Sequence, residues 1–175
     1  MEWWIIAVVL MGGALGVVRM AEAGVEAAPP YVDRIHWFQL RTPWPWQMTG
    51  GSRRGEEVLT ATWPGFPSVA VSLKIRPLAE LPELVAREQL IGQAEDVLRM
   101  FTSDPIHEIT GWPLAGAWSD GVASAGMCRR VVVLMDAPRR RAFVWVAVAP
   151  ARIFPQFDVA FDQLALGLVP TLPEE

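Results

Sequence analysis

The sequence is poor in the side chains that usually build catalytic or metal-binding sites. It has one cysteine, two histidines and one tyrosine among 175 residues. The single cysteine, Cys128, excludes a disulfide within the chain. There is no Gly-x-Ser-x-Gly sequence, no glycine-rich phosphate loop and no cluster of cysteines and histidines, the motifs of hydrolases, nucleotide-binding proteins and zinc sites. We therefore expect no enzymatic activity, no cofactor and no bound metal.

Positive charge is scarce as well. The chain has 15 Lys and Arg residues against 19 Asp and Glu residues, a formal net charge of -4, and Lys74 is its only lysine. A nucleic-acid-binding surface needs an excess of basic residues. The composition therefore argues against a nucleic-acid partner.

Charge is absent altogether near the start of the chain. Residues 3–18 are sixteen consecutive uncharged residues, followed by Arg19. As a helix they extend about 24 Å, and a few more residues, with Arg19 reaching toward the head groups, span a hydrocarbon core of about 30 Å. Trp3 and Trp4 lie at the other end, where indole rings favour the membrane–water interface. We predict a transmembrane anchor helix over residues 1–22.

The alternative for this segment is a cleaved signal peptide. Ala21-Glu22-Ala23 fits the small-residue cleavage pattern, but no Lys or Arg precedes the apolar run, as a signal peptide requires. We therefore favour a retained anchor. Its Gly12 and Gly16 are four residues apart, the small-xxx-small spacing that allows close approach of another transmembrane helix.

The rest of the chain is the size of one domain. Residues 23–34 contain small residues and end shortly after two prolines, which is typical of a linker. We assign residues 35–170 to a single domain and residues 171–175 to a C-terminal tail.

The hydrophobic pattern predicts strands on either side of one long helix. The helix is expected from Pro82 to Phe101, and a second amphipathic helix from Phe157 to Leu168 closes the domain. Strands are expected at residues 35–40, 46–49, 57–63, 68–75, 106–110, 114–119, 127–136 and 141–149. The last two form a hairpin through residues 137–140, and the Asp-Gly pair within Ser119-Asp120-Gly121 predicts another hairpin turn.

The final strand indicates how the layers are arranged. Residues 143–148 are apolar at both odd and even positions, so both faces of the sheet must be covered. We expect an α+β fold: an α/β/α sandwich with a mostly antiparallel sheet covered by helices on both faces, preceded by one N-terminal transmembrane helix.

These elements, in this order, resemble the PsbP-like family, which is named for the extrinsic subunit of the oxygen-evolving photosystem and includes bacterial DcrB-like relatives. The matching segments are Trp37-Phe38-Gln39-Leu40, Pro43-Trp44-Pro45-Trp46, Ile109-Thr110-Gly111-Trp112 with Gly116-Ala117, and the Phe-rich segment from Phe154 to Leu168. The resemblance implies an α/β/α sandwich and a non-enzymatic role at membrane complexes or in the cell envelope. It covers nearly the whole domain but not the predicted anchor.

Two signals disagree about the side of the membrane on which the domain lies. Arg19 and Arg34 follow the apolar run, and the positive-inside tendency places such a flank in the cytoplasm. The resemblance implies an extracytoplasmic, periplasmic location. We follow the resemblance.

The few reactive side chains fit structural roles better than catalytic ones. A metal site could use Asp33 with His36, or His107 with Glu108, but adjacent residues of a strand point to opposite faces. Cys128 precedes two arginines that could lower a thiol pKa, yet no base accompanies it. We expect edge or partly buried histidines and a buried packing cysteine.

Two features are typical of contact surfaces instead. Arg139, Arg140 and Arg141 lie at the tip of the last hairpin, where guanidinium groups suit carboxylates or lipid phosphates, or else form a simple solvated turn. Trp44 and Trp46, between prolines, are candidate aromatic anchors for a partner, or else plug one end of the sandwich.

Together these observations predict a membrane-anchored accessory or assembly subunit of a larger membrane protein complex. Its expected partners are integral membrane subunits and the lipid bilayer, and a photosynthetic reaction-centre or light-harvesting complex is the most specific candidate. The alternatives are a solitary DcrB-like envelope protein and an enzyme on the same scaffold.

Overall fold

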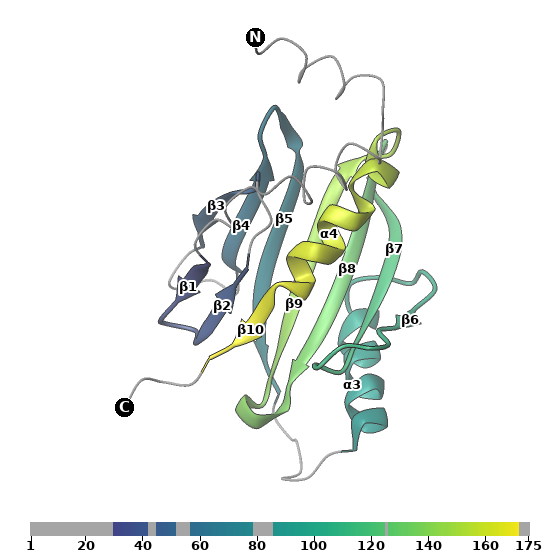
Figure 1. Cartoon of the computed structure of the whole chain (residues 1–175). Helices are drawn as coiled ribbons and strands as arrows, with labels where there is room; N and C mark the ends of the chain where they lie inside the picture. Colours follow the sequence, from purple (N-terminus) through teal and green to yellow (C-terminus); the bar gives the residue numbers. More distant parts are fainter. Residues whose placement is uncertain (1–29, 42–44, 52–56, 79–85, 125, 172–175) are drawn as a thin grey trace.

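The fold is built around one large antiparallel sheet (Figure 1). The computed structural model describes residues 30–41, 45–51, 57–78, 86–124 and 126–171. The sheet has seven strands in the order β3-β4-β5-β9-β8-β7-β6. These are β3 (Gln47–Gly50), β4 (Glu57–Trp63), β5 (Phe66–Pro77), β6 (His107–Glu108), β7 (Gly116–Ser124), β8 (Met127–Asp136) and β9 (Arg141–Pro150). Every pairing is antiparallel, as the sequence predicts.

The central strands are long because both of their faces are buried. In β8, Val131, Val133 and Met135 point to one face, while Val132 and Leu134 point to the other, and all are buried. Strands β8 and β9 pair over ten residues with no shift in register, from Met127–Pro150 to Asp136–Arg141. The 3-10 turn η1 (Ala137–Arg139) joins them, which confirms the predicted hairpin.

One helix covers each face of this sheet. Helix α3 (Arg87–Arg99) packs Ala94, Val97 and Leu98 against an aliphatic cluster from β7, β8 and β9. Residues 79–85, including the predicted start at Pro82, lie outside the described residues. The closing helix is α4 (Asp158–Leu166), preceded by the 3-10 turn η2 (Phe154–Phe157), and it covers the opposite face (Figure 1). The α+β sandwich is therefore confirmed.

A second, three-stranded sheet lies beside α4 on the same face (Figure 1). It consists of β1 (Tyr31–Asp33), β2 (Phe38–Leu40) and β10 (Leu168–Pro170), in the order β1-β2-β10. Strand β1 lies in the stretch predicted as a linker, and β10 follows α4 where only a helix end was expected. Both strands are only three residues long, which is too short for a period to stand out. Strand β1 pairs with β2 across the four-residue turn 34–37, and β10 pairs with β2 from the far end of the chain.

The Asp-Gly turn prediction is wrong. Asp120 and Gly121 lie inside β7, opposite Arg130 and Arg129 of β8. The chain turns later, after Ser124, where Gly126 has a φ of 77°. The pairing with β8 and the interaction of Asp120 with Arg130 outweigh the local turn preference.

The predicted anchor, residues 1–22, lies outside the described residues. Neither helix that the structure describes has the length and apolar character required to traverse a bilayer.

Candidate interaction surfaces

The arginine hairpin differs from the solvated basic tip that the sequence predicts. Only Arg140 is exposed, at the left-handed end of η1 with a φ of 48°. Arg141 is 8% exposed, and its Nε donates to Oδ2 of Asp136 at 2.8 Å. Arg139 donates to both carboxylate oxygens of Asp136, at 3.1 and 3.2 Å. Two of the three arginines are therefore occupied by the buried carboxylate of Asp136, which is 2% exposed.

The same arginines tie the small sheet to the hairpin. The two terminal nitrogens of Arg141 donate to the backbone carbonyl oxygens of His36 and Trp37, between β1 and β2. Arg139 donates to the carbonyl oxygen of Thr171, whose N–H donates to Trp37 O at 2.9 Å. We call Asp136, Arg139 and Arg141 the Asp136 cluster. Its structural role is not evident from three consecutive arginines in the sequence. The signal that could have found it is Asp136 itself, which ends the strand directly opposite Arg141.

Trp46 is a core residue. It is 8% exposed, and its ring meets that of Trp63 edge to face, with centroids 5.2 Å apart. Trp63 in turn lies 5.2 Å from Phe157 of η2, and Phe157 lies 6.0 Å from Phe66. The alternative in which Trp46 plugs the sandwich is thus the one that the packing favours. Trp44 lies outside the described residues, as do Trp3, Trp4, Gly12 and Gly16.

A second charged group, which the sequence analysis missed, lies under α4. Arg130 is 6% exposed and donates through two nitrogens to the carboxylate of Asp120, at 2.8 and 2.7 Å. It also donates to Asp162 at 2.9 Å and lies 3.6 Å from Asp158. We call these four residues the Arg130 cluster. Asp158 and Asp162 are four positions apart on α4 and so share one helix face, a spacing that could have indicated a common partner.

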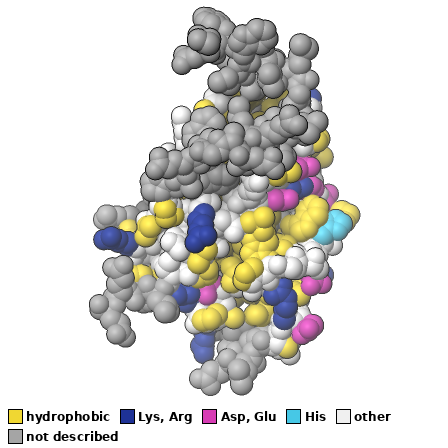
Figure 2. Space-filling view, viewed as in Figure 1, with side chains coloured by type: hydrophobic (Ala, Val, Ile, Leu, Met, Phe, Trp, Pro, Cys, Tyr) yellow, Lys and Arg dark blue, Asp and Glu magenta, His cyan; other side chains and the backbone are white. Residues whose placement is uncertain are grey.

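Aromatic rings complete the surroundings of Arg130. Its Cζ lies 4.9 Å from the ring centroid of Trp118 and 6.0 Å from that of Phe154. Stacking on a ring face favours a guanidinium, because its charge meets the negative face of the π system. Figure 2 shows hydrophobic side chains gathered beside acidic ones on this face of the molecule, near a histidine.

The environment shifts the proton affinities of this cluster. Burial alone lowers the pKa of Arg130, but its hydrogen bonds to Asp120 and the charges of the three carboxylates more than offset this and raise it. Burial raises the pKa of Asp158 and Asp162, and neighbouring carboxylates add to the rise, although Arg130 opposes it. The cluster therefore holds a permanently charged arginine against Asp158 and Asp162, two carboxylates that accept protons more readily than usual.

The predicted pair of Asp33 and His36 does come together. His36 Nδ1 lies 2.9 Å from Oδ2 of Asp33, while Oδ1 accepts the backbone N–H groups of Ile35 and His36. Asp33 is thus the organiser of the turn between β1 and β2. The pair borders an open hollow of about 340 Å³ that Tyr31 also lines, and burial, with a smaller effect of Asp33, raises the pKa of the Tyr31 hydroxyl.

His107 is exposed on the edge strand β6, and Cys128 has a packing position. The imidazole of His107 stacks on Trp118, with ring centroids 4.6 Å apart. Cys128 is half-buried at the rim of the α4-side core. Among the described residues, no three His, Cys, Asp or Glu side chains come together as metal ligands could.

Comparison with solved structures identifies the architecture. The solution structure of the cyanobacterial PsbP (CyanoP) from Synechocystis sp. PCC 6803 superposes with a TM-score of 0.54, over 85% of this chain and 95% of that one. The chain has a PsbP-like fold. This PsbP-like chain also matches a crystal structure from Bacteroides thetaiotaomicron VPI-5482 with a TM-score of 0.59, over 86% of this chain and 51% of that one.

Sequence identity to both structures is 10%, so the likeness concerns the fold alone. No family model matches the PsbP-like chain, and no curated protein does either. The fold implied by the resemblance to the PsbP-like family is thus confirmed at the level of structure.

Proposed function

We propose that this protein is a non-enzymatic, membrane-anchored accessory or assembly subunit of a larger membrane protein complex. The most specific form of the proposal is a photosynthetic reaction-centre or light-harvesting complex, with the domain on the extracytoplasmic side. The observation that carries the proposal is the PsbP-like fold across 85% of the chain. The apolar run at residues 3–18 supplies the reason for a membrane setting.

The chemistry of the described residues supports a binding role. Arg130, Arg139 and Arg141 hold structural elements together through carboxylates and carbonyl oxygens. His36 and His107 pair with Asp33 and Trp118, respectively. These contacts give the arginine and histidine side chains structural roles.

The direct test is the behaviour of the protein in its own membrane. After carbonate washing, membranes are solubilised in mild detergent and separated by size, and the position of the chain is followed with an antibody. We expect the chain to stay with the membrane and to elute with pigment-binding or cytochrome subunits, identified by absorbance. A chain that elutes alone would favour a solitary DcrB-like envelope protein, and a chain that washes off would contradict the anchor.

A matched pair of glycine variants tests how the subunit is held. Replacing Gly12 and Gly16 by Leu adds bulk to the predicted small-xxx-small face, so the chain should leave the complex while remaining in the membrane. Gly13→Leu adds one leucine outside that spacing and serves as the control, beside Gly12→Leu alone, which adds one leucine within it. Equal loss from the complex in the two single variants would contradict packing through Gly12 and Gly16.

A further inference from the structure

One end of the large sheet brings three connecting segments together. We call this surface the hairpin end; it consists of residues 63–67 between β4 and β5, residues 122–124 and 126–127 between β7 and β8, and residues 150–157 after β9. The N–H of Ala151 donates to the carbonyl oxygen of Gly126 at 2.9 Å, which joins the second segment to the third. The rings of Phe66 and Phe157, 6.0 Å apart, join the first to the third.

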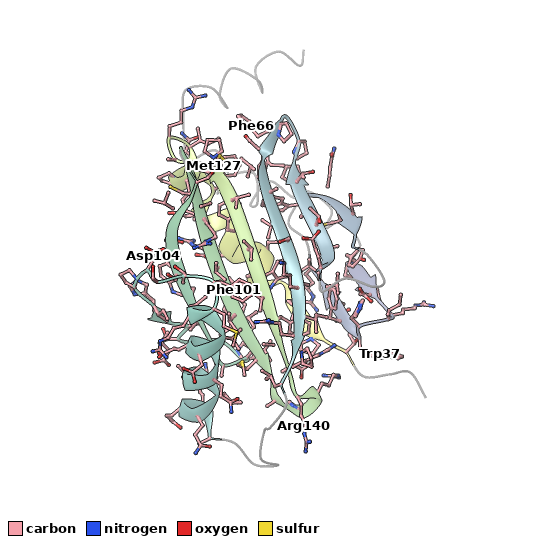
Figure 3. The ribbon with its side chains drawn as sticks, turned by 180° about the vertical axis from the view of Figure 1, so that it is seen from behind. Trp37, Phe66, Phe101, Asp104, Met127 and Arg140 are labelled. Carbon is pink, nitrogen blue, oxygen red and sulfur yellow. The ribbon has the colours of Figure 1, made fainter. Side chains whose placement is uncertain are left out.

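Figure 3 shows Phe66 and Met127 at this end of the sheet, and Trp37 and Arg140 at the other. The register agrees, because Met127 pairs with Pro150 at one end of the β8–β9 ladder and Asp136 pairs with Arg141 at the opposite end. The hairpin end and the Asp136 cluster therefore lie at opposite ends of the same strands.

Large apolar side chains protrude from the hairpin end. Val122 is 71% exposed and Phe66 is 48% exposed. Phe66 follows Gly65, which has a φ of 79°, in a turn bounded by Pro64 and Pro67. Phe66 packs against Phe157 on one side and leaves about half of its surface in solvent. Exposed apolar surfaces of this kind mark contact sites.

The charge of this surface has one sign. The segments of the hairpin end contain no Asp or Glu, and their only charged residue is the exposed Arg152. Arg129, also half-exposed, follows two residues after Met127. The first carboxylate beyond the surface, Asp158, faces Arg130 at 3.6 Å. A local positive charge in a chain with a net charge of -4 is complementary to an anionic surface.

We propose that the hairpin end rests on an anionic lipid bilayer, with Phe66 in the interfacial region and Arg152 and Arg129 at the lipid phosphates. Aromatic rings favour the interface, and each guanidinium near an anionic membrane adds electrostatic attraction. This proposal rests on the membrane anchoring in the proposed function and adds to it the surface that faces the lipid.

The chain length is compatible with this orientation. Eight residues, 23–30, separate the predicted anchor from β1, and an extended chain of that length reaches at most about 29 Å. The tether therefore does not dictate which end of the domain meets the bilayer. At the opposite end, Arg139 and Arg141 are already bound to Asp136. At the hairpin end, Arg152 is exposed, and the nearby carboxylates of Asp120, Asp158 and Asp162 face Arg130.

Site-specific fluorescence in the full chain tests the orientation. In a Cys128→Ala background, one new cysteine is placed in the hairpin end by Ser124→Cys, or at the opposite end by Ile35→Cys, where the side chain is 58% exposed. Each is labelled with the fluorophore NBD and reconstituted into vesicles of phosphatidylcholine and phosphatidylglycerol. We expect blue-shifted emission and quenching by doxyl-labelled lipid at position 124 only.

Two charge-reversal variants, compared at the same label position, test the role of the arginine directly. Arg152→Glu in the Ser124→Cys protein should lower the ratio of docked to undocked molecules by about fivefold or more, the effect of one guanidinium at an anionic surface. Arg140→Glu, the same change at an exposed arginine of the opposite end, should leave the ratio unchanged. Vesicles of phosphatidylcholine alone should reduce quenching as Arg152→Glu does.

The outcomes separate this proposal from the proposed function. If the protein floats with the vesicles while position 124 stays in water, or position 35 is quenched instead, the docking is wrong and the anchoring stands. Blue-shifted emission at position 124 without quenching by doxyl-labelled lipid, seen only when the other subunits of the complex are present, would identify a protein as the occupant and also overturn the proposal. A protein that does not float at all would contradict the anchoring, and the docking with it.

Discussion

The two arginine clusters use the same chemistry with opposite burial. In the Asp136 cluster the carboxylate is the buried partner, at 2% exposed, and the side chains of Arg139 and Arg141 surround it at 22% and 10%. In the Arg130 cluster the arginine is buried, with its side chain 7% exposed, and the carboxylates of Asp120, Asp158 and Asp162 are 39–56% exposed.

The comparison teaches that the cost of breaking a charge pair depends on which partner can return to water. A carboxylate at the surface regains hydration when its arginine is lost, while charges enclosed by the fold do not. The Asp136 cluster also connects three separate parts of the chain through carbonyl oxygens, whereas the Arg130 cluster connects α4 to β7 and β8. We expect the Asp136 cluster to be the more sensitive of the two.

The largest effect is expected for Asp136→Ala. It leaves Arg139 and Arg141 without their counter-charge in a mostly dry site, which typically costs about 3–5 kcal/mol. The measurement is the free energy of unfolding from urea denaturation. Asp96→Ala, at a side chain that is 71% exposed on α3, is the matched control and should change stability by no more than about 0.5 kcal/mol. Equal costs in the two variants would refute the structural role of Asp136.

Arg141→Lys should have an intermediate effect. A lysine ammonium cannot reproduce a fork that reaches Asp136, His36 and Trp37 at once, so we expect a loss of about 1–3 kcal/mol. Arg140→Lys, one residue earlier and exposed, should be neutral. Hydrogen exchange at β1 and β2 provides a second readout, because only Arg141→Lys should increase it. Unchanged protection in both strands would show that Arg141 does not hold the small sheet.

Arg130→Met is expected to cost less than Asp136→Ala, about 1–2 kcal/mol, although it removes an arginine with three acidic partners. The methionine keeps contact with Trp118 and Phe154, and the released carboxylates are exposed enough to be hydrated. Urea denaturation of both variants in parallel decides the order. If Arg130→Met is the more damaging, burial of the arginine matters more than hydration of its partners.

The smallest effect concerns pH. The pKa of Asp162 is raised in the folded state, so its contribution favours folding below the unfolded pKa and is lost as pH rises through the folded value. Asparagine does not titrate, so Asp162→Asn avoids this loss. From about pH 3.5 to pH 7, the free energy of unfolding of the variant should therefore rise relative to that of the native chain by a few tenths of a kcal/mol after solvent screening. Denaturation curves at both pH values measure this. The reverse trend would mean that Arg130 dominates the titration of Asp162.

Local patterns predicted the strands of the large sheet well. The alternation in residues 57–63 and the apolar run in residues 127–136 gave the bounds of β4 and β8 as the structure has them. These strands carry their signal in their own residues, because each buries the side chains that define its period. The long helix was predicted for the same reason, from Ala94, Leu98 and their neighbours.

The parts that sequence reasoning missed depend on tertiary contacts and not on a local pattern. Strands β1 and β10 exist because β2 lies between them, and the fate of Arg139–Arg141 depends on Asp136 and on carbonyl oxygens of residues 36, 37 and 171. The turn signal of Asp120-Gly121 was misread because Arg130 and the β8 register decide that segment. Buried charge pairs and three-residue strands are set by tertiary structure, which a single sequence does not display.

The uninterrupted β8–β9 ladder has a mechanical consequence. Ten paired residues at about 3.3 Å each form a strut roughly 33 Å long, with the tip that bears Phe66 beyond one end and Arg140 at the other. If the hairpin end rests on lipid, the η1 turn lies at a fixed distance above the membrane surface. A neighbouring subunit that contacts this turn must therefore extend at least as far from the membrane as the β8–β9 ladder does.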